Sequence, residues 1–321
     1  MDQPEHIYAV AYIHAQEKSM LTAQMLDQLI SAGSYDDALR LLADWGYDVQ
    51  QGDMNAIIRA QRDKAWQLIC SLVDDVSVFD VFLLANDYHN LKAVIKQVYT
   101  NTYVEGIYLP DGKVPCADIL SAIKENDPHR LPEALCAAAE TAVELFRRTS
   151  DGQLLDISVD ISALEAIRAA AEASDCEVLS LYAELTIAIA NIKTAVRAQR
   201  AGKDIDFITR ALCLCSTLDV ERLARAAGAT IEEVTAYLAE TEYKEASEIL
   251  KSSASEFERW CDNALIRRLR SQKYEYFGVG PLAAYYLAKE NELKSVRIIL
   301  SGKKTGMTAE SLRERVREMY V

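Results

Sequence analysis

Glycine and proline are scarce in this chain, which has 12 Gly and 6 Pro among its 321 residues. Architectures of strands and tight turns need more chain breakers than this, so the low count favours a mostly helical protein. No segment shows the strict apolar–polar alternation that indicates a half-buried strand. Half of the residues are apolar and a quarter are charged, so the chain can bury a sizeable core, which excludes disorder over most of its length.

Long apolar runs are also lacking. None reaches the roughly 18–20 residues that a membrane-spanning helix needs, and the early stretch Ile7–Ile13 lacks the basic segment of a signal peptide. We therefore expect the protein to be made and kept in the cytoplasm. The seven cysteines are scattered and odd in number, with no CxxC and only a weak CxC at Cys213 and Cys215. We expect all of them to be reduced and mostly buried.

Positive charge is the minority charge, with 35 Lys and Arg against 49 Asp and Glu and a net charge of −14. So acidic a chain repels phosphates, which argues against nucleic acid as a partner. The distribution is uneven, because residues 259–321 carry a net charge of +6 and residues 1–258 carry −20. This asymmetry predicts two electrostatically distinct ends that meet different surfaces, although helices whose charged faces differ in composition give the same count.

Motifs that carry chemistry are largely absent. There is no HExxH motif and no EF-hand loop, and Gly278–Pro281 lacks the spacing of a phosphate-binding loop. The four histidines have no paired spacing, so a zinc site is not expected. We therefore predict no catalytic residue, no cofactor site and no metal site.

Three polar patterns allow a functional interpretation beside a structural one. Asp87 and His89 could form an acid–base pair, although the favoured interpretation is a group of structural polar residues at a helix start. The carboxylates around Asp74–Asp80 faintly resemble the aspartate-rich motif of the all-α isoprenoid synthases, but they lack its DDxxD spacing. The basic and aromatic segment Arg267–Phe277 could contact lipid headgroups or an acidic partner, or could be a solvated helix face.

Apolar periodicity predicts helices along the whole chain. The clearest break is the loop Asn101–Pro115, which contains two Gly and two Pro. Thr22, Thr230 and Thr308 stand where helix N-caps are expected, and Pro281 suits the first turn of a helix. The fold class is therefore all-α. The main predicted helical segments are 7–48, 53–72, 79–98, 117–124, 131–148, 156–202, 219–249, 253–273, 281–304 and 308–321.

One short string recurs three times at intervals of 101 residues, and we call its copies the repeat strings. They are Asn90–Lys96, Asn191–Arg197 and Glu292–Ile298. Such spacing predicts three similar helical lobes of about a hundred residues around a pseudo-threefold axis. The approximate bounds are 1–110, 111–215 and 216–321, in a chain that starts and ends partway through a repeat. The alternative is that this pattern, which is common in helical proteins, recurs by chance.

The repeat strings and their surroundings resemble the C subunit of the V/A-type rotary ATPases, whose family includes the d subunit of the eukaryotic V-ATPase. The resemblance covers most of the chain and is strongest in the last forty residues. It is weakest over Asp48–Val78 and Ser216–Arg259, and Cys213–Ser216 replaces a segment that usually carries glycine in the family. The segments that carry it are Tyr8–Lys18, Leu21–Tyr47, Asp87–Lys92, Asn191–Lys193 with Arg197, Gly280–Lys303 and Arg313–Val321.

This resemblance implies a non-catalytic helical funnel of three lobes on the cytoplasmic face of the membrane. Its implied partners are the central shaft and the membrane-embedded proteolipid ring, between which it acts as a socket that transmits torque. The candidate partner contacts are basic residues that follow the repeat strings: Arg197, Arg200, Lys203, Arg297, Lys303 and Lys304. For Arg197 and Arg297, pairing with carboxylates between lobes is an equal alternative.

The polar residues that open the repeat strings, Asn90, Asn191 and Glu292, either line the central axis or cap neighbouring helices. Two other functions remain open at this stage. One is a free-standing helical-repeat adaptor, which needs only the repeat. The other is an all-α enzyme that uses a diphosphate substrate.

Overall fold

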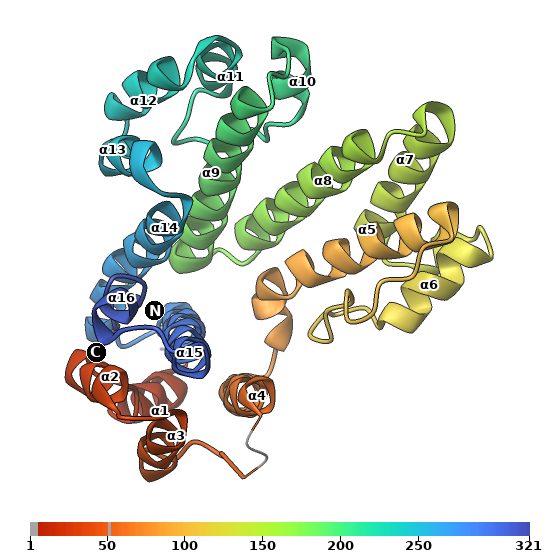
Figure 1. Cartoon of the computed structure of the whole chain (residues 1–321). Coiled ribbons are helices and arrows are strands. Elements are labelled where there is room, and N and C mark those ends of the chain that lie inside the picture. Colours follow the sequence, from red (N-terminus) through yellow and green to blue (C-terminus); the bar gives the residue numbers. More distant parts are fainter. Residues whose placement is uncertain (1–5, 51–52) are drawn as a thin grey trace. The chain divides into compact units, whose positions relative to one another are not determined.

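The computed structural model describes residues 6–50 and 53–321, and every regular element in that part of the chain is a helix (Figure 1). The predicted all-α class is confirmed. The chain divides into two compact units. Unit 1 comprises residues 1–76, 176–178 and 248–321, and unit 2 comprises residues 77–175 and 179–247. The three-lobed funnel and its bounds stay predictions.

Unit 1 combines the two ends of the chain. Its N-terminal helices are α1 (Ile7–Glu17), α2 (Ala23–Ser31), α3 (Tyr35–Asp44) and α4 (Met54–Leu72). Its C-terminal elements are α14 (Ala254–Leu269), the 3₁₀ helix η3 (Arg270–Tyr274), α15 (Gly280–Lys304) and α16 (Ala309–Arg313). Unit 2 contains α5 (Leu84–Thr100), α6 (Cys116–Lys124), η2 (Pro128–Arg130), α7 (Glu133–Thr149), α8 (Gly152–Ala173), α10 (Ile205–Arg210), α11 (Val220–Ala229) and α12 (Ile231–Ala239). Three elements straddle a unit boundary: η1 (Val76–Phe82), α9 (Glu177–Arg200) and α13 (Lys244–Ser252).

The predicted N-caps form as expected. The hydroxyl oxygens of Thr22, Thr230 and Thr308 each accept a hydrogen bond from the backbone N–H three residues on, at 3.2 Å in every case. Each cap satisfies one of the free N–H groups at a helix start. Pro281 lies in the first turn of α15. Local sequence signals therefore set these helix starts.

The core of unit 1 surrounds α15, which is buried along most of its length and packs against α4, α1 and α3 (Figure 1). Leu29, Leu42 and Ile58 from the N-terminal helices share one apolar cluster with Leu293 and Ile299 of α15. The two ends of the chain therefore supply opposite halves of a single core.

The core of unit 2 forms where α5 packs against α6, α7 and α8. The repeat-string residues Leu91, Val94 and Ile95 are fully buried there, as their helical spacing predicts. The helix α9 is long and apolar enough to cross a membrane by length and composition. Half of its apolar window is buried inside the protein.

The predicted last helix is too long. A helix over residues 308–321 is expected from the sequence, but α16 ends at Arg313. Beyond it, the backbone N–H groups of Arg317 and Glu318 donate to the side chains of Ser295 and Asn263 instead of to the preceding turn. Side chains of α14 and α15 thus take over the hydrogen bonds that would have continued the helix.

Candidate functional site

The polar residue that opens each repeat string lies in the interior of a long helix. Asn90 lies in α5, Asn191 in α9 and Glu292 in α15, and each is 1% exposed. Buried polar groups are costly unless they are hydrogen-bonded. The partners of these three side chains therefore show what the repeat strings do.

The two asparagines make the same bidentate contact with a main-chain segment. Asn90 donates to the carbonyl of Leu109 at 2.8 Å and accepts from its N–H at 2.8 Å. Asn191 donates to the carbonyl of Cys213 at 2.7 Å and accepts from its N–H at 2.9 Å. Each amide thus satisfies one main-chain donor and one acceptor, and fixes a loop that lies about twenty residues further along the chain.

The residues around Asn90 hold the rest of that loop. Asn86 donates to the carbonyl of Asp111, and His89 donates to that of Ile107. The Asp87 carboxylate accepts from the N–H of Val114 at 3.0 Å. Asp87 and His89 thus form hydrogen bonds with separate main-chain groups, which supports a structural role near the helix start over an acid–base pair.

Burial shapes the chemistry of Asp87. It raises the pKa of this carboxyl above its usual value, although the hydrogen bonds from the loop oppose the shift. Gly112 passes so close that an added Cβ would lie 2.4 Å from the Asp87 carboxylate oxygen. Only glycine therefore allows the loop to approach this carboxylate.

A carboxylate of the same helix as Asn191 also binds the backbone of the neighbouring loop in unit 2. One oxygen of the Glu184 carboxylate accepts from the backbone N–H groups of Ser216 at 2.8 Å and Thr217 at 2.7 Å. The thiol of Cys213, in the CxC pair, has its pKa raised to about 11, mainly by burial. A thiol with so high a pKa is a packing residue rather than a nucleophile.

Glu292 makes a different contact at the third position. Its carboxylate accepts from the N–H of Leu21 at 2.7 Å, the hydroxyl of Tyr47 at 2.5 Å and the ammonium of Lys289 at 2.5 Å. Burial, reinforced by the nearby Glu292, raises the pKa of Tyr47 well above its usual value. This buried network, which we call the Glu292 network, ties both ends of the chain together.

Residues of α15 in and next to the repeat string also bind the C-terminal segment. Asn291 donates to the carbonyl of Glu318 at 2.8 Å, and Ser295 accepts from the N–H of Arg317 at 3.0 Å. The Arg317 guanidinium forms an ion pair with Asp262 of α14 at 2.8 Å. All three strings therefore bond main-chain groups of other segments, whereas their placement at a central axis and their capping of neighbouring helices stay predictions.

The exposed positions in the second half of α15 are mostly basic. They are Lys294, Arg297, Ser301 and Lys304, which we call the α15 basic stripe. Their spacing of three, four and three residues places them on one helix face. Lys294 pairs with Asp262 at 2.7 Å, and the Lys304 ammonium lies 4.7 Å from the centre of the Tyr35 ring. Arg297 has no hydrogen bond or ion pair with any described residue of unit 1.

The other candidate contacts differ in how far they are engaged. Arg197 and Arg200 are exposed near the end of α9, and Arg197 donates only to the carbonyl of Lys193 among the described residues of unit 2. Lys203 donates to Gln153 at 2.7 Å and lies over an aromatic ring. Lys303 donates to the main-chain carbonyls of Ile30 and Ala32. Lys203 and Lys303 therefore make intramolecular contacts, and their role as partner contacts stays a prediction.

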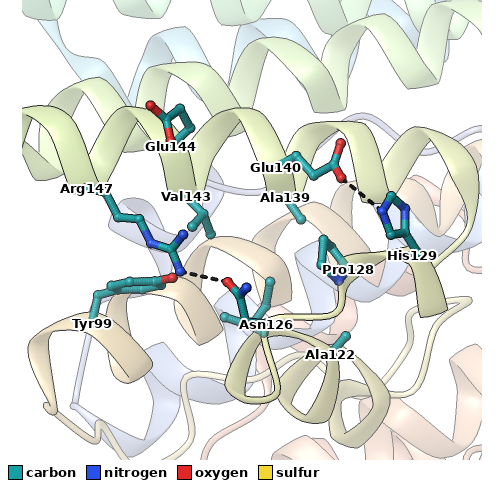
Figure 2. A pocket seen from close by; sticks show the side chains of 11 residues that line it. Tyr99, Ala122, Asn126, Pro128, His129, Ala139, Glu140, Val143, Glu144 and Arg147 are labelled. Atoms are coloured by element: carbon teal, nitrogen blue, oxygen red, sulfur yellow. Dashed lines mark hydrogen bonds and ion pairs between the residues drawn. The ribbon is translucent and has the colours of Figure 1, made fainter.

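Sequence reasoning missed one cluster. His129, Cys136 and Glu140 lie close together beside α7, and His129 and Glu140 line an open pocket of about 400 Å³ (Figure 2). The available signal was the Cys–Glu spacing of four residues on a predicted helix, with a histidine shortly before it. No paired histidines stand there, so a search for paired motifs passes over it.

Comparison with known proteins bears on the whole chain. A family model described as ATP synthase (C/AC39) subunit matches residues 9–315. The chain is 23% identical to the C subunit of the V-type sodium ATPase of Enterococcus hirae, covering 96% of this chain and 97% of that protein. It is 22% identical to the C subunit of the A-type ATP synthase of Methanocaldococcus jannaschii, with 98% and 86% covered. It is 24% identical to the C subunit of a V-type ATP synthase of Thermus thermophilus, with 91% and 92% covered.

Proposed function

Because the chain belongs to the ATP synthase (C/AC39) subunit family, we propose that it is the socket between the central shaft and the proteolipid ring of a rotary ATPase. The family makes it a component of a V/A-type ATPase, without an active site of its own. As part of such a complex it is membrane-associated. The cytoplasmic face, the shaft and the ring belong to the proposal.

A torque-transmitting socket needs a stiff body rather than reactive side chains. Close-packed helices resist deformation, and the repeat strings hold two loops and the C-terminal segment through hydrogen bonds that are buried or partly buried. The Glu292 network adds a charged junction between residues that lie 271 and 245 positions apart. These internal ties support a mechanical role.

The observation that carries the proposal is the α15 basic stripe. It is the exposed face of a helix that is otherwise largely buried, in a chain whose net charge is −14. Complementary charge sets the register of an interface and speeds encounter. Arg297 and Lys304 of the stripe form no ion pair within unit 1 among the described residues, so both can meet an acidic partner surface. The exposed Arg197 and Arg200 of α9 offer unit 2 a second basic contact.

The first test is recovery of a tagged full-length chain from detergent-solubilised membranes of the source cell, with co-purifying chains identified by mass. The proposal expects shaft proteins together with a very hydrophobic ring protein. Recovery of the chain alone, or with a partner unrelated to a rotary ATPase, would overturn it and favour the adaptor alternative.

The second test reverses charge on the stripe. The double variant Arg297→Glu with Lys304→Glu should reduce recovery of the partners most strongly at low ionic strength, because exposed charges are screened within about 8 Å at physiological salt. Lys64→Glu is the control, since Lys64 is also exposed in unit 1 but lies on α4. Equal recovery of all variants at every salt concentration would remove the stripe from the interface.

A further inference from the structure

Three different kinds of metal ligand meet at the turn before α7. His129 comes from η2, while Cys136 and Glu140 lie four residues apart on α7 and so share one helix face. Figure 2 shows His129 and Glu140 pointing toward one another across the edge of the pocket. The cluster lies within unit 2 and is separate from the repeat strings and from the loop residues that they bind.

The distances suit a shared ion. The His129 Nδ1 lies 3.6 Å from the Cys136 Sγ, while the other ring nitrogen, Nε2, lies 3.6 Å from a Glu140 carboxylate oxygen. An ion bound at Nδ1 beside Cys136 therefore requires the exposed Glu140 side chain to rotate toward it. One ligand atom from each residue can be chosen so that all lie within 4.8 Å of one another. In a tetrahedral zinc centre, bonds of about 2.0–2.1 Å to nitrogen and about 2.3 Å to sulfur put these two atoms about 3.6 Å apart.

The ligand set selects the kind of metal. Imidazole nitrogen, thiolate sulfur and carboxylate oxygen together suit zinc, whereas magnesium and calcium prefer oxygen ligands alone. The side chains of His129 and Glu140 are 78% and 50% exposed, so both can rotate onto an ion without repacking the core. We infer that His129, Cys136 and Glu140 bind one zinc ion, with water in the fourth position on the pocket side.

Binding is coupled to loss of a proton. A cysteine thiol ordinarily has a pKa of about 8.5, so the metal-free protein carries the S–H form of Cys136 at neutral pH. When zinc binds, the S–H bond breaks, the Zn–S bond forms and the proton passes to the buffer. The bound ion then cross-links the η2 turn to α7.

The site does not depend on the proposed function. The cross-link would fix the connection between α6 and α7, which already rests on the hydrogen bond from Arg147 to Asn126 at 2.7 Å (Figure 2). Loss of the metal site would leave the socket proposal unchanged, and failure of the pull-down would leave the metal site unchanged.

Cobalt titration of the full-length protein, stripped of metal with a chelator, tests the site directly. Cobalt bound by a thiolate gives a charge-transfer absorption in the near ultraviolet. We expect one cobalt ion per chain, displaced by zinc. Cys136→Ser should abolish the band, while His129→Ala and Glu140→Gln should each weaken cobalt binding by at least about tenfold.

Two controls separate this site from the other thiols and carboxylates. The double variant Cys213→Ser with Cys215→Ser should keep the band, because the CxC pair is not part of the cluster. Glu144→Gln should also keep it, since Glu144 lines the same pocket but is not one of the three ligands. Absence of a band at excess cobalt would overturn the inference. A band that survives Cys136→Ser and His129→Ala would overturn it as well.

Discussion

The first residue of the repeat string forms a different kind of hydrogen-bonding contact in each of the two units. In unit 2 the string opens with a neutral amide, and Asn90 and Asn191 each bond the N–H and the carbonyl of one residue 19 or 22 positions further along. In unit 1 it opens with a carboxylate, and Glu292 bonds residues from the opposite end of the chain. An amide both donates and accepts, so the main-chain N–H and carbonyl of a single residue satisfy it. A carboxylate only accepts, so Glu292 needs several donors.

This difference predicts unequal sensitivity to mutation. A buried charge is tolerated only while its partners are in place, and its loss leaves other buried groups unpaired. A lost neutral amide leaves only one main-chain donor and one acceptor. The tryptophans separate the two responses, because Trp45, Trp66 and Trp260 all lie in unit 1. Their fluorescence reports unit 1, whereas far-ultraviolet circular dichroism reports both units.

The largest effect is expected for Glu292→Ala. Removal of the carboxylate leaves the Lys289 ammonium and the Tyr47 hydroxyl without their buried partner. We expect the free energy of unfolding of unit 1 to fall by about 3–5 kcal/mol, measured by urea titration with tryptophan fluorescence. Glu290→Ala is the matched control, because its ion pair with Arg62 is partly solvated and contributes about 1 kcal/mol or less. Equal losses in both variants would contradict a special role for Glu292.

Asn191→Ala should follow, with its loss confined to unit 2. The main-chain N–H and carbonyl of Cys213, a residue that is 2% exposed, lose their partner without gaining water. We expect destabilisation of about 1–3 kcal/mol. The transition followed by circular dichroism should shift to lower urea, while the fluorescence transition stays in place. A fluorescence shift of the same size would show that the two units unfold together.

Asn90→Ala should cost less than Asn191→Ala. Its partner Leu109 is 37% exposed and lies in a long loop, so water can replace part of the lost contact. We expect about 1 kcal/mol, measured in the same titration. A loss as large as that of Asn191→Ala would mean that the loop does not admit water.

The smallest effect is a pH dependence within unit 1. Burial lowers the pKa of His14, but its hydrogen bonds to the Glu275 carbonyl and to Glu17 outweigh this and raise the pKa above 6.5. The stabilisation by His14 is therefore present below the unfolded pKa and is lost as the pH rises through the folded value. The stability difference between wild type and His14→Gln should be larger at about pH 5.5 than at about pH 9. No change with pH would contradict this coupling.

Local signals of the sequence account for much of the fold. The spacing of Leu91, Val94 and Ile95 predicts the buried face of α5, and the caps at Thr22 and Thr308 are local as well. The end of α16 could not be predicted, because it depends on side chains of Ser295 and Asn263 that arrive from other helices.

The candidate site was less accessible to sequence reasoning. The repeat predicts which residues matter, and Asn90, Asn191 and Glu292 are all buried and bonded. Their partners depend on folding, since the N–H that Glu292 accepts lies 271 residues earlier in the chain. Folding also distinguishes Arg297, which is exposed and pairs with no described residue of unit 1, from Lys303, whose ammonium donates to two main-chain carbonyls. Sequence alone gives both the same charge.

The shared core of unit 1 has a consequence for protein synthesis. Leu29, Leu42 and Ile58 emerge from the ribosome long before Leu293 and Ile299, which complete their apolar cluster. At about 5–20 residues per second, the first helices wait roughly 10–50 s for α15. Unit 2 needs no such partner and can fold meanwhile. During this interval the first helices lack the α15 residues that complete their apolar cluster in the folded protein.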